Sequence, residues 1–208
     1  MAFIKKSPGS ETLAHEERRF ARDCAGLALE LESADASERR WAARDLADCP
    51  DASALLLSRL QREDDASVRE LILSTLTRLG DEVAVLGLVN CLRSENAALR
   101  NEAIECMKQL PDEVAPIMQC LLADADADVR IFAVNVLESL CHPEVESWLI
   151  QVIESDAQVN VCATAVDLLG EVGSAAARDA LLRLKARFAD EPYMQFATDL
   201  ALKRLAAN

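Results

Sequence analysis

The chain of 208 residues is poor in aromatic side chains, glycine, proline and histidine. Aromatic residues make up 4% of it, glycine and proline number 6 each, and histidine numbers 2. So few glycines and prolines disfavour long irregular loops, and an apolar content rich in leucine, alanine, valine and isoleucine favours helices packed closely on helices. The composition therefore predicts an all-α protein.

Positive charge is also scarce, because 22 lysine and arginine residues stand against 36 aspartate and glutamate residues, for a formal net charge of −14. Such a chain repels nucleic acid and anionic membranes at long range, so we expect no nucleic acid and no membrane as partner. No apolar stretch approaches the roughly 18 residues of a membrane-spanning helix. With nucleic acid and membranes excluded as partners, we expect this acidic chain to bind another protein.

The spacing of the cysteines shows no obvious disulfide pair and no metal-binding motif. There are 7, an odd number, and none has CxxC spacing. Most fall at apolar positions of the helical pattern, where cysteine acts as a small hydrophobic residue. Lys5 and Lys6 are followed by Ser7-Pro8-Gly9-Ser10, not by the apolar segment of a secretion signal. We therefore expect unpaired thiols in a reducing compartment and a cytoplasmic location.

What the chain does have is a motif that returns about every thirty residues. Within a copy, apolar residues recur at helical spacing, as in Val68, Ile72, Leu76 and Leu79. A fixed period of this size indicates a solenoid of stacked helices. The copies begin at Glu38, Val68, Leu99, Val129, Val161 and Met194.

A second helix is predicted before each motif helix from the second copy on. Asp and Ser residues fill the turns between the two helices, as in Asp124, Asp126 and Asp128. We interpret them as helix caps and not as metal ligands, because this turn lacks the central glycine and the final glutamate of a calcium loop. Stop signals follow the motif helices at Pro50, Gly80, Pro111 and Gly173. The predicted first helices span 54–60, 83–92, 114–122, 145–153 and 175–188, which places Pro116 in a first turn.

These repeats resemble the HEAT repeat, in the short bacterial form that also occurs in phycobilin lyases. The resemblance rests on DDASVRELILSTLTRLG, ENAALRNEAIECMKQLP, DADADVRIFAVNVLESLC and VCATAVDLLGEVG, and covers roughly residues 38–205. It implies a right-handed α-α superhelix of roughly five to six helix pairs. It also implies that Arg39, Arg69, Arg100 and Arg130 are partly buried and pair with acidic turn residues of neighbouring repeats. Cys162 and Gln195 occupy the same position in later copies, which implies a weaker ladder toward the C-terminus.

Three segments are expected along the chain. Residues 1–10 form a disordered tail, residues 11–34 a capping helix, and residues 35–208 a solenoid that makes a single domain with its cap. Leu13, Phe20, Cys24, Leu27 and Leu31 fit one face of the capping helix. A docking helix for a partner is the alternative interpretation of residues 11–34.

Little in the sequence points to catalysis or to a cofactor. His142 and its neighbour Cys141 would need ligands from distant repeats to complete a zinc site. The single His15-Glu16 dyad cannot build the di-iron site of the deoxyhypusine hydroxylases, which are HEAT-like enzymes with repeated dyads. Phosphate-binding glycine loops and nucleophile elbows are absent from the sequence. We therefore predict no enzyme activity, no metal and no cofactor.

The predicted binding surface is the concave face, which the motif helices line in this repeat type. The third, fourth, seventh and eleventh motif positions turn away from the core. Trp41, Leu71, Ile131 and Phe132 are apolar there, which is typical of partner anchors, or of packing between neighbouring repeats or against the N-terminal helix. The candidate partner-binding residues are Arg40, Trp41, Arg44, Glu70, Leu71, Ser74, Asn101, Glu105, Ile131, Phe132, Asn135 and Asp167.

The sequence thus predicts a non-enzymatic scaffold or adaptor that binds a protein on a preorganised concave surface, as a monomer or weak oligomer. The alternative is an accessory subunit or chaperone that handles a client protein or cofactor, as the phycobilin lyases do.

Overall fold

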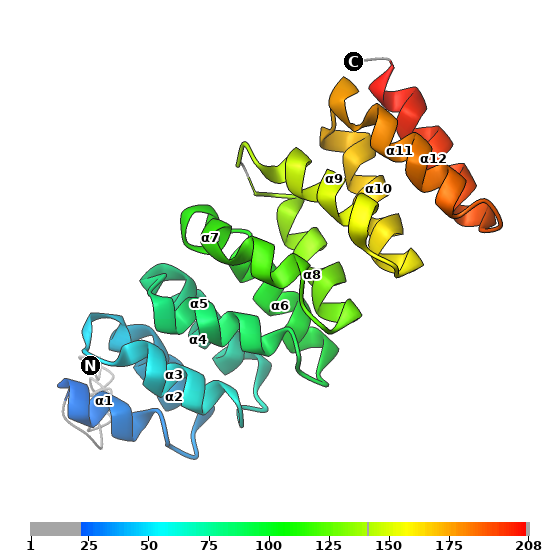
Figure 1. Cartoon of the computed structure of the whole chain (residues 1–208). Coiled ribbons are helices and arrows are strands. Elements are labelled where there is room, and N and C mark those ends of the chain that lie inside the picture. Colours follow the sequence, from blue (N-terminus) through cyan, green and yellow to red (C-terminus); the bar gives the residue numbers. More distant parts are fainter. Residues whose placement is uncertain (1–21, 141, 207–208) are drawn as a thin grey trace, which may run out of the picture.

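The computed structural model describes residues 22–140 and 142–206, and their regular elements are all helical. Consecutive helices are joined by short turns and stack side by side, so the described chain forms an elongated rod with its two ends far apart (Figure 1). The all-α solenoid predicted from the repeat is confirmed, with six helix pairs in the described residues.

The helices fall into two layers along the rod. The second-helix layer consists of α2 (Ala36–Asp45), α4 (Ala66–Leu79), α6 (Ala97–Met107), α8 (Ala127–Leu137), α10 (Val159–Val172) and α12 (Pro192–Leu205). The first-helix layer consists of α1 (Cys24–Glu30), α3 (Ala52–Leu60), α5 (Glu82–Cys91), α7 (Pro111–Leu122), α9 (Val145–Ser155) and α11 (Arg178–Arg187). Single 3-10 turns occupy Leu46–Asp48 and Ala175–Ala177.

The core runs between the two layers for the whole described length. Its largest fully buried side chains include Ile72, Leu76, Met107, Leu137 and Leu149. Neighbouring second helices contact one another more extensively than neighbouring first helices do. The second-helix layer, which contains the predicted binding residues, is therefore the more closely packed of the two.

Asp and Asn side chains begin most of the helices, as the turn composition predicts. Asp65 accepts hydrogen bonds from the backbone N–H groups of Ser67 and Val68 at the start of α4. Asp35, Asp81, Asn96 and Asp126 cap α2, α5, α6 and α8 in the same way. These oxygens satisfy backbone donors that no helical carbonyl can reach, so the acidic turns serve the fold.

Two details at the helix ends differ from the sequence prediction. Helix α7 begins at Pro111, three residues before the predicted start, so Pro116 lies inside the helix instead of in its first turn. Gly80 adopts the left-handed conformation expected past a helix end, with φ of 57°. Gly173 is extended, with φ of −74°. A Cβ there would lie 2.4 Å from the carbonyl oxygen of Leu169, so close approach of the backbone requires this glycine.

The prediction of unpaired thiols is wrong for one pair, because Cys24 and Cys49 form a disulfide. The bond joins α1 to the segment just after the 3-10 turn Leu46–Asp48, and a sequence separation of 25 residues gave no sign of it. An ion pair between Arg22 and Asp45 links the same two segments. Cys91, Cys106, Cys120 and Cys162 are free thiols. The disulfide removes the argument from unpaired thiols for a reducing compartment.

The predicted tail at 1–10 and the first part of the predicted capping helix, 11–21, lie outside the described residues. Within the described part, Leu27 of α1 and Leu31, which follows the helix, are buried against the solenoid. None of the described helices has the length and apolar character needed to cross a membrane.

Candidate functional site

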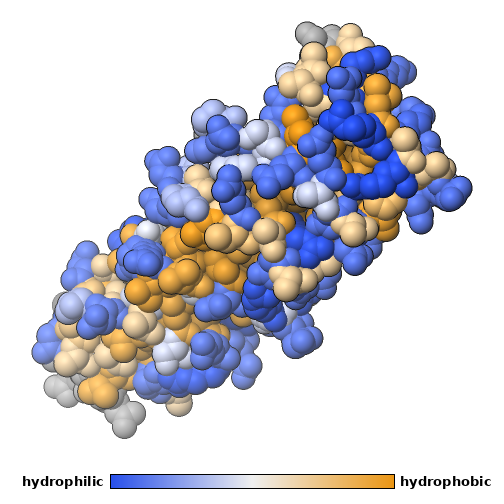
Figure 2. All heavy atoms as spheres, viewed as in Figure 1, coloured by the Kyte–Doolittle hydropathy of each residue, from blue (hydrophilic) through white to orange (hydrophobic). Residues whose placement is uncertain are grey.

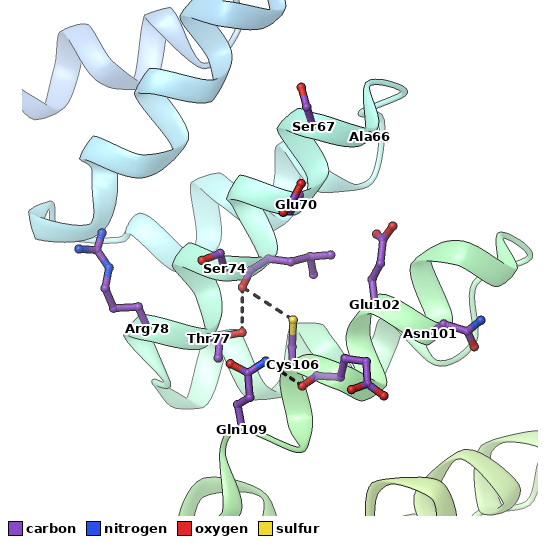
Figure 3. Close-up of a pocket in the computed structure, with 12 residues that line it drawn as sticks. Ala66, Ser67, Glu70, Ser74, Thr77, Arg78, Asn101, Glu102, Cys106 and Gln109 are labelled. Carbon is purple, nitrogen blue, oxygen red and sulfur yellow. Dashed lines mark hydrogen bonds between the residues drawn. The ribbon is translucent and has the colours of Figure 1, made fainter. Parts of the chain in front are cut away.

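A groove of about 940 Å³ opens in the second-helix layer between α4 and α6 (Figure 3). Both helices present their third, seventh and eleventh motif positions to it, since these positions turn away from the core. Of the predicted binding residues, Glu70, Ser74, Asn101 and Glu105 line this groove together. The complete lining is Ala66, Ser67, Glu70, Leu73, Ser74, Thr77, Arg78, Asn101, Glu102, Glu105, Cys106 and Gln109.

The floor of the groove is apolar and its polar atoms are paired. Leu73 and Cys106 are buried core residues that also line the groove. The Leu73 carbonyl oxygen accepts hydrogen bonds from the Thr77 hydroxyl at 2.9 Å and from Cys106 Sγ at 3.9 Å (Figure 3). Burial raises the pKa of the Cys106 thiol. The floor therefore offers a neutral packing surface and no activated nucleophile.

The walls of the groove carry three carboxylates and one guanidinium. Glu70 has no ion pair or hydrogen bond with a described side chain. Glu102 lies 3.6 Å from Arg69 Nε, too far for a hydrogen bond, and Arg69 Nε has no other partner among the described residues. The guanidinium of Arg78 donates to the backbone carbonyl of Arg44 at 3.0 Å. Negative charge consequently dominates the groove.

A second cavity, of about 250 Å³, lies in the same layer between α8 and α10. Asn135 and Asp167, two more of the predicted binding residues, line it with Glu138, Thr164 and Glu171. Asp167 accepts a hydrogen bond from the Tyr193 hydroxyl at 2.9 Å, and this bond raises the pKa of Tyr193. Acidic side chains thus also line a cavity two repeats further along the rod.

Lys108 lies between the two cavities and connects their walls. Its Nζ is 3.0 Å from Glu105 on α6 and 2.8 Å from Glu138, which follows α8. These two carboxylates hold the pKa of Lys108 above its ordinary value, the bond to Glu138 having the larger effect. Lys108 is the only lysine paired with the carboxylates of these two cavities in the described part of the chain.

The four apolar candidates behave differently from one another. Trp41 is 50% exposed, and the Arg44 guanidinium carbon lies 4.5 Å from the centroid of its ring. Leu71, Ile131 and Phe132 are partly buried and pack against the core, and Arg100 lies over the Phe132 ring. Of these four candidates, Trp41 alone has a largely exposed side chain, while the other three follow the packing alternative. Arg40 is exposed beside Trp41.

The sequence reasoning missed three apolar side chains on α12. Phe196 is 65% exposed, Tyr193 56% and Leu200 38%. Phe196 and Leu200 occupy the third and seventh positions of the last motif copy, the same positions that line the groove in α4 and α6. Extending the list of outward positions to that copy would have found them.

The predicted arginine ladder forms in part. Arg39 and Arg130 bind acidic residues of the next repeat, with Arg39 Nε 2.8 Å from Glu63 and Arg130 Nε 2.6 Å from Asp156. Arg69 lies 3.6 Å from Glu102, which belongs to helix α6 of the next repeat and not to its turn. Arg100 pairs with no acidic side chain among the described residues. All four, however, donate to a backbone carbonyl in the turn before their own helix, the acceptors being Ser33, Asp64, Ser94 and Asp124. The shared role of these arginines is to fix the turn within each repeat.

At Cys162 and Gln195, where the ladder is expected to weaken, other hydrogen bonds take the place of an arginine pair. Arg187 of α11 places its guanidinium within hydrogen-bond distance of the carbonyls of Ile153, Glu154 and Asp156 and of Cys162 Sγ. Gln195 donates to the carbonyl of Lys185, in the last turn of α11, and to that of Phe188, just after α11. Both positions are therefore held by other hydrogen bonds, which a motif alignment cannot show.

Glu63 is the most strongly perturbed carboxylate near these turns. Its side chain is 1% exposed. Burial raises its pKa, but hydrogen bonds from Arg39, from the Asp65 backbone and from Arg59 outweigh burial and hold the pKa at about 2. Glu63 faces the turn and not the groove, so we assign it to stability.

No group of three or more His, Cys, Asp or Glu side chains in the described residues is arranged to hold a metal ion. His142 stacks on Trp148 with ring centroids 4.9 Å apart. His15 lies outside the described residues.

On the face seen in Figure 2, hydrophobic surface gathers over the middle of the rod and polar surface surrounds it. The exposed large apolar residues of α3 and α5 are Leu55, Val83 and Leu86, in the first-helix layer.

The comparison with family models identifies two matching stretches, residues 25–108 and 114–193, which both match the model described as HEAT repeats. No curated protein sequence matches the chain.

Several solved structures are similar in arrangement. The complex of CpcE and CpcF of phycocyanin lyase from Nostoc sp. PCC7120 is 19% identical, with 95% of this chain and 100% of that chain covered and a TM-score of 0.39. Human deoxyhypusine hydroxylase in complex with glycerol is 17% identical, covers 89% and 85% of the two chains, and has a TM-score of 0.44. An engineered protein is 20% identical over 89% and 97%, with a TM-score of 0.41.

Proposed function

The chain belongs to the HEAT-repeat family, and from this premise we propose that it is a non-enzymatic adaptor that binds a partner protein on its second-helix layer. The observation that carries the proposal is the open groove between α4 and α6, with a second cavity between α8 and α10 in the same layer. A preformed surface of this kind binds with little loss of conformational entropy.

Trp41 supplies the strongest candidate anchor for that partner. It lies on α2, at the N-terminal end of the same layer, and half of its surface is exposed. Arg44 stacks on the ring and restricts its motion. Tryptophan and arginine are over-represented among the residues that dominate binding energy at interfaces. We propose that the chain presents this surface as a cytoplasmic monomer or weak oligomer.

The test is affinity capture from native lysate with the wild-type chain, a Trp41→Ala variant and a Leu86→Ala control. Leu86 is also 50% exposed, but it lies on α5 in the first-helix layer. Because both side chains are exposed, both variants should keep the helical circular dichroism of the wild type. We expect Trp41→Ala to lose the partner, at a cost of about 2 kcal/mol or more in binding free energy, and Leu86→Ala to retain it.

Identical captures from all three proteins would contradict a binding role for the second-helix layer. Loss of the partner with Leu86→Ala alone would move the interface to the first-helix layer. A chromophore or other small molecule that copurifies with the chain, or catalysis by it, would instead favour an accessory subunit that handles a cofactor.

A further inference from the structure

We propose that the occupant of the groove is an extended segment of a partner protein rich in lysine and arginine. This inference rests on the proposed adaptor function and specifies the chemistry of the partner. Its basis is a row of carboxylates that line the second-helix layer, all of them exposed except Glu102, which is half-buried. An apolar floor lies below the carboxylates of the α4–α6 groove. The row consists of Glu70 on α4, Glu102 and Glu105 on α6, Glu138 after α8, and Asp167 and Glu171 on α10.

These carboxylates are not used by the fold in the way that the turn carboxylates are. Glu63 and Asp156 are buried against arginines, and Asp65 and Asp126 cap helices. In the row, by contrast, the side chains of Glu105, Glu138 and Glu171 are 68%, 58% and 60% exposed. Among the described residues, four cations lie near the six carboxylates. Arg69 lies 3.6 Å from Glu102, Lys108 pairs with Glu105 and Glu138, and Arg204 lies 3.8 Å from Glu171. Arg78 lines the groove but donates to the Arg44 carbonyl.

The spacing of the carboxylates places like charges together on single helices. Glu102 and Glu105 are three residues apart on α6, and Asp167 and Glu171 are four residues apart on α10. Side chains at these spacings are neighbours on a helix surface, and like-charged pairs there destabilise the helix. A cationic partner would relieve this repulsion, so the arrangement favours binding over the free state.

The groove also has the shape that lysine and arginine side chains require. Leu73, Thr77 and Cys106 form a floor on which the methylene groups of a partner's lysine or arginine side chains can pack. The carboxylates lie on the walls above this floor (Figure 3). Long cationic side chains bury their stems on apolar surface while the charged group stays at the edge. The volume of about 940 Å³ admits several such side chains and not a folded domain.

Charge excludes the other macromolecular occupants. A formal net charge of −14 disfavours nucleic acid, an anionic membrane and a second copy of this acidic chain at the same surface.

The spacing of the helices suits an extended peptide. Neighbouring packed helices lie about 8–10 Å apart, and an extended peptide advances about 3.3 Å per residue. A basic residue at every third position would therefore meet the carboxylates of successive helices.

The experiment measures fluorescence anisotropy of a labelled peptide of about twelve residues, with arginine or lysine at every third position and serine or glycine between. A second peptide carries glutamate at the same positions. Both are titrated with the full chain, with a groove variant (Glu70→Gln, Glu105→Gln) and with a control variant (Glu95→Gln, Asp190→Asn). Glu95 and Asp190 are exposed and lie outside the groove, and both variants lose the same net charge.

We expect the basic peptide to bind the wild type, and the groove variant to bind it at least about fivefold more weakly while the control changes by less than about twofold. Lys108 keeps Glu138 as a partner in the groove variant, so the fold should survive. Equal weakening in both variants would reveal general attraction to an acidic protein and overturn the proposal. Equal binding of the glutamate peptide, or no binding of the basic one, would overturn it as well.

The same two variants, used in the lysate capture, separate this inference from the adaptor function. A partner lost with Trp41→Ala but kept by the groove variant would sustain the adaptor function and refute the basic segment. No dependence on Trp41 together with no peptide binding would refute both.

Discussion

At the scale of single residues, buried charge is used to join repeats and exposed charge is left on the binding face. Arg39 and Glu63 illustrate the first use, because Glu63 also accepts from Arg59 and from the Asp65 backbone. A buried pair with so many partners recovers much of its desolvation cost. Removing one partner leaves the other charge buried and unpaired, which is far more costly than losing a surface pair.

We predict that Glu63→Gln lowers the free energy of unfolding at pH 7 by about 3 kcal/mol. The folded-state pKa of Glu63 is depressed, so its stabilisation is fully present above pH 4.5 and is lost as pH falls through about 2. Urea denaturation of wild type and variant across this range measures both effects. The difference between them should shrink toward pH 2, and a constant difference would contradict the assigned pKa. Glu95→Gln, an exposed change in the next turn, is the control.

At the scale of elements, α1 is a short helix that depends on its connections. It has seven residues, too few to be stable alone. Leu27 and Leu31 attach it to the core, the Cys24–Cys49 disulfide joins it to the segment that follows α2, and Arg22 pairs with Asp45. The covalent link and the ion pair act at the same end of the helix, so reduction should release that end first.

We expect the free energy of unfolding of the Cys24→Ser, Cys49→Ser variant to be about 3.5 kcal/mol lower than that of the oxidised wild type, the value for a closed loop of 25 residues. Reductant should lower the stability of the wild type and leave that of the variant unchanged. Peptide mapping without reduction should recover Cys24 and Cys49 in one cross-linked species. Recovery of both as free thiols would show that the bond does not form under those conditions.

At the scale of the whole molecule, each repeat is stabilised by contacts with the repeats next to it. Each second helix packs chiefly on the second helices before and after it, and no contact joins the two ends of the described rod. Solenoids of this kind can open locally, repeat by repeat. The C-terminal repeats depend in particular on Arg187, which joins α11 to the end of α9 and to Asp156 in the turn before α10.

Hydrogen exchange tests this locality through Arg187→Met, which keeps the aliphatic stem and removes the guanidinium. We predict that amides of α11, α12 and the turn at Asp156 exchange about tenfold or more faster, because several hydrogen bonds from a charged group are lost. Amides of α4 and α6 should be unchanged. Arg183→Met is the control, since Arg183 is 64% exposed and pairs only with Glu154. Uniform acceleration along the rod would contradict a nearest-neighbour solenoid.

The sequence by itself determined the repeat architecture, the capped turns and the outward positions of the second helices. The reason is that these depend on helical periodicity and on local hydrogen bonding, which lie within about thirty residues. Glu70, Ser74, Asn101 and Glu105 could thus be named from their spacing, and the structure brings them to one groove.

Only the tertiary structure decided which side chains meet across repeats. The disulfide, the contacts of Arg187 and the burial of Leu71, Ile131 and Phe132 all depend on the rotation between successive helix pairs. A shift of a few ångströms there exchanges a buried side chain for an exposed one, and the helical period carries no information on that shift. Trp41 and Phe132 share the same motif position, and only packing separates the exposed ring from the covered one.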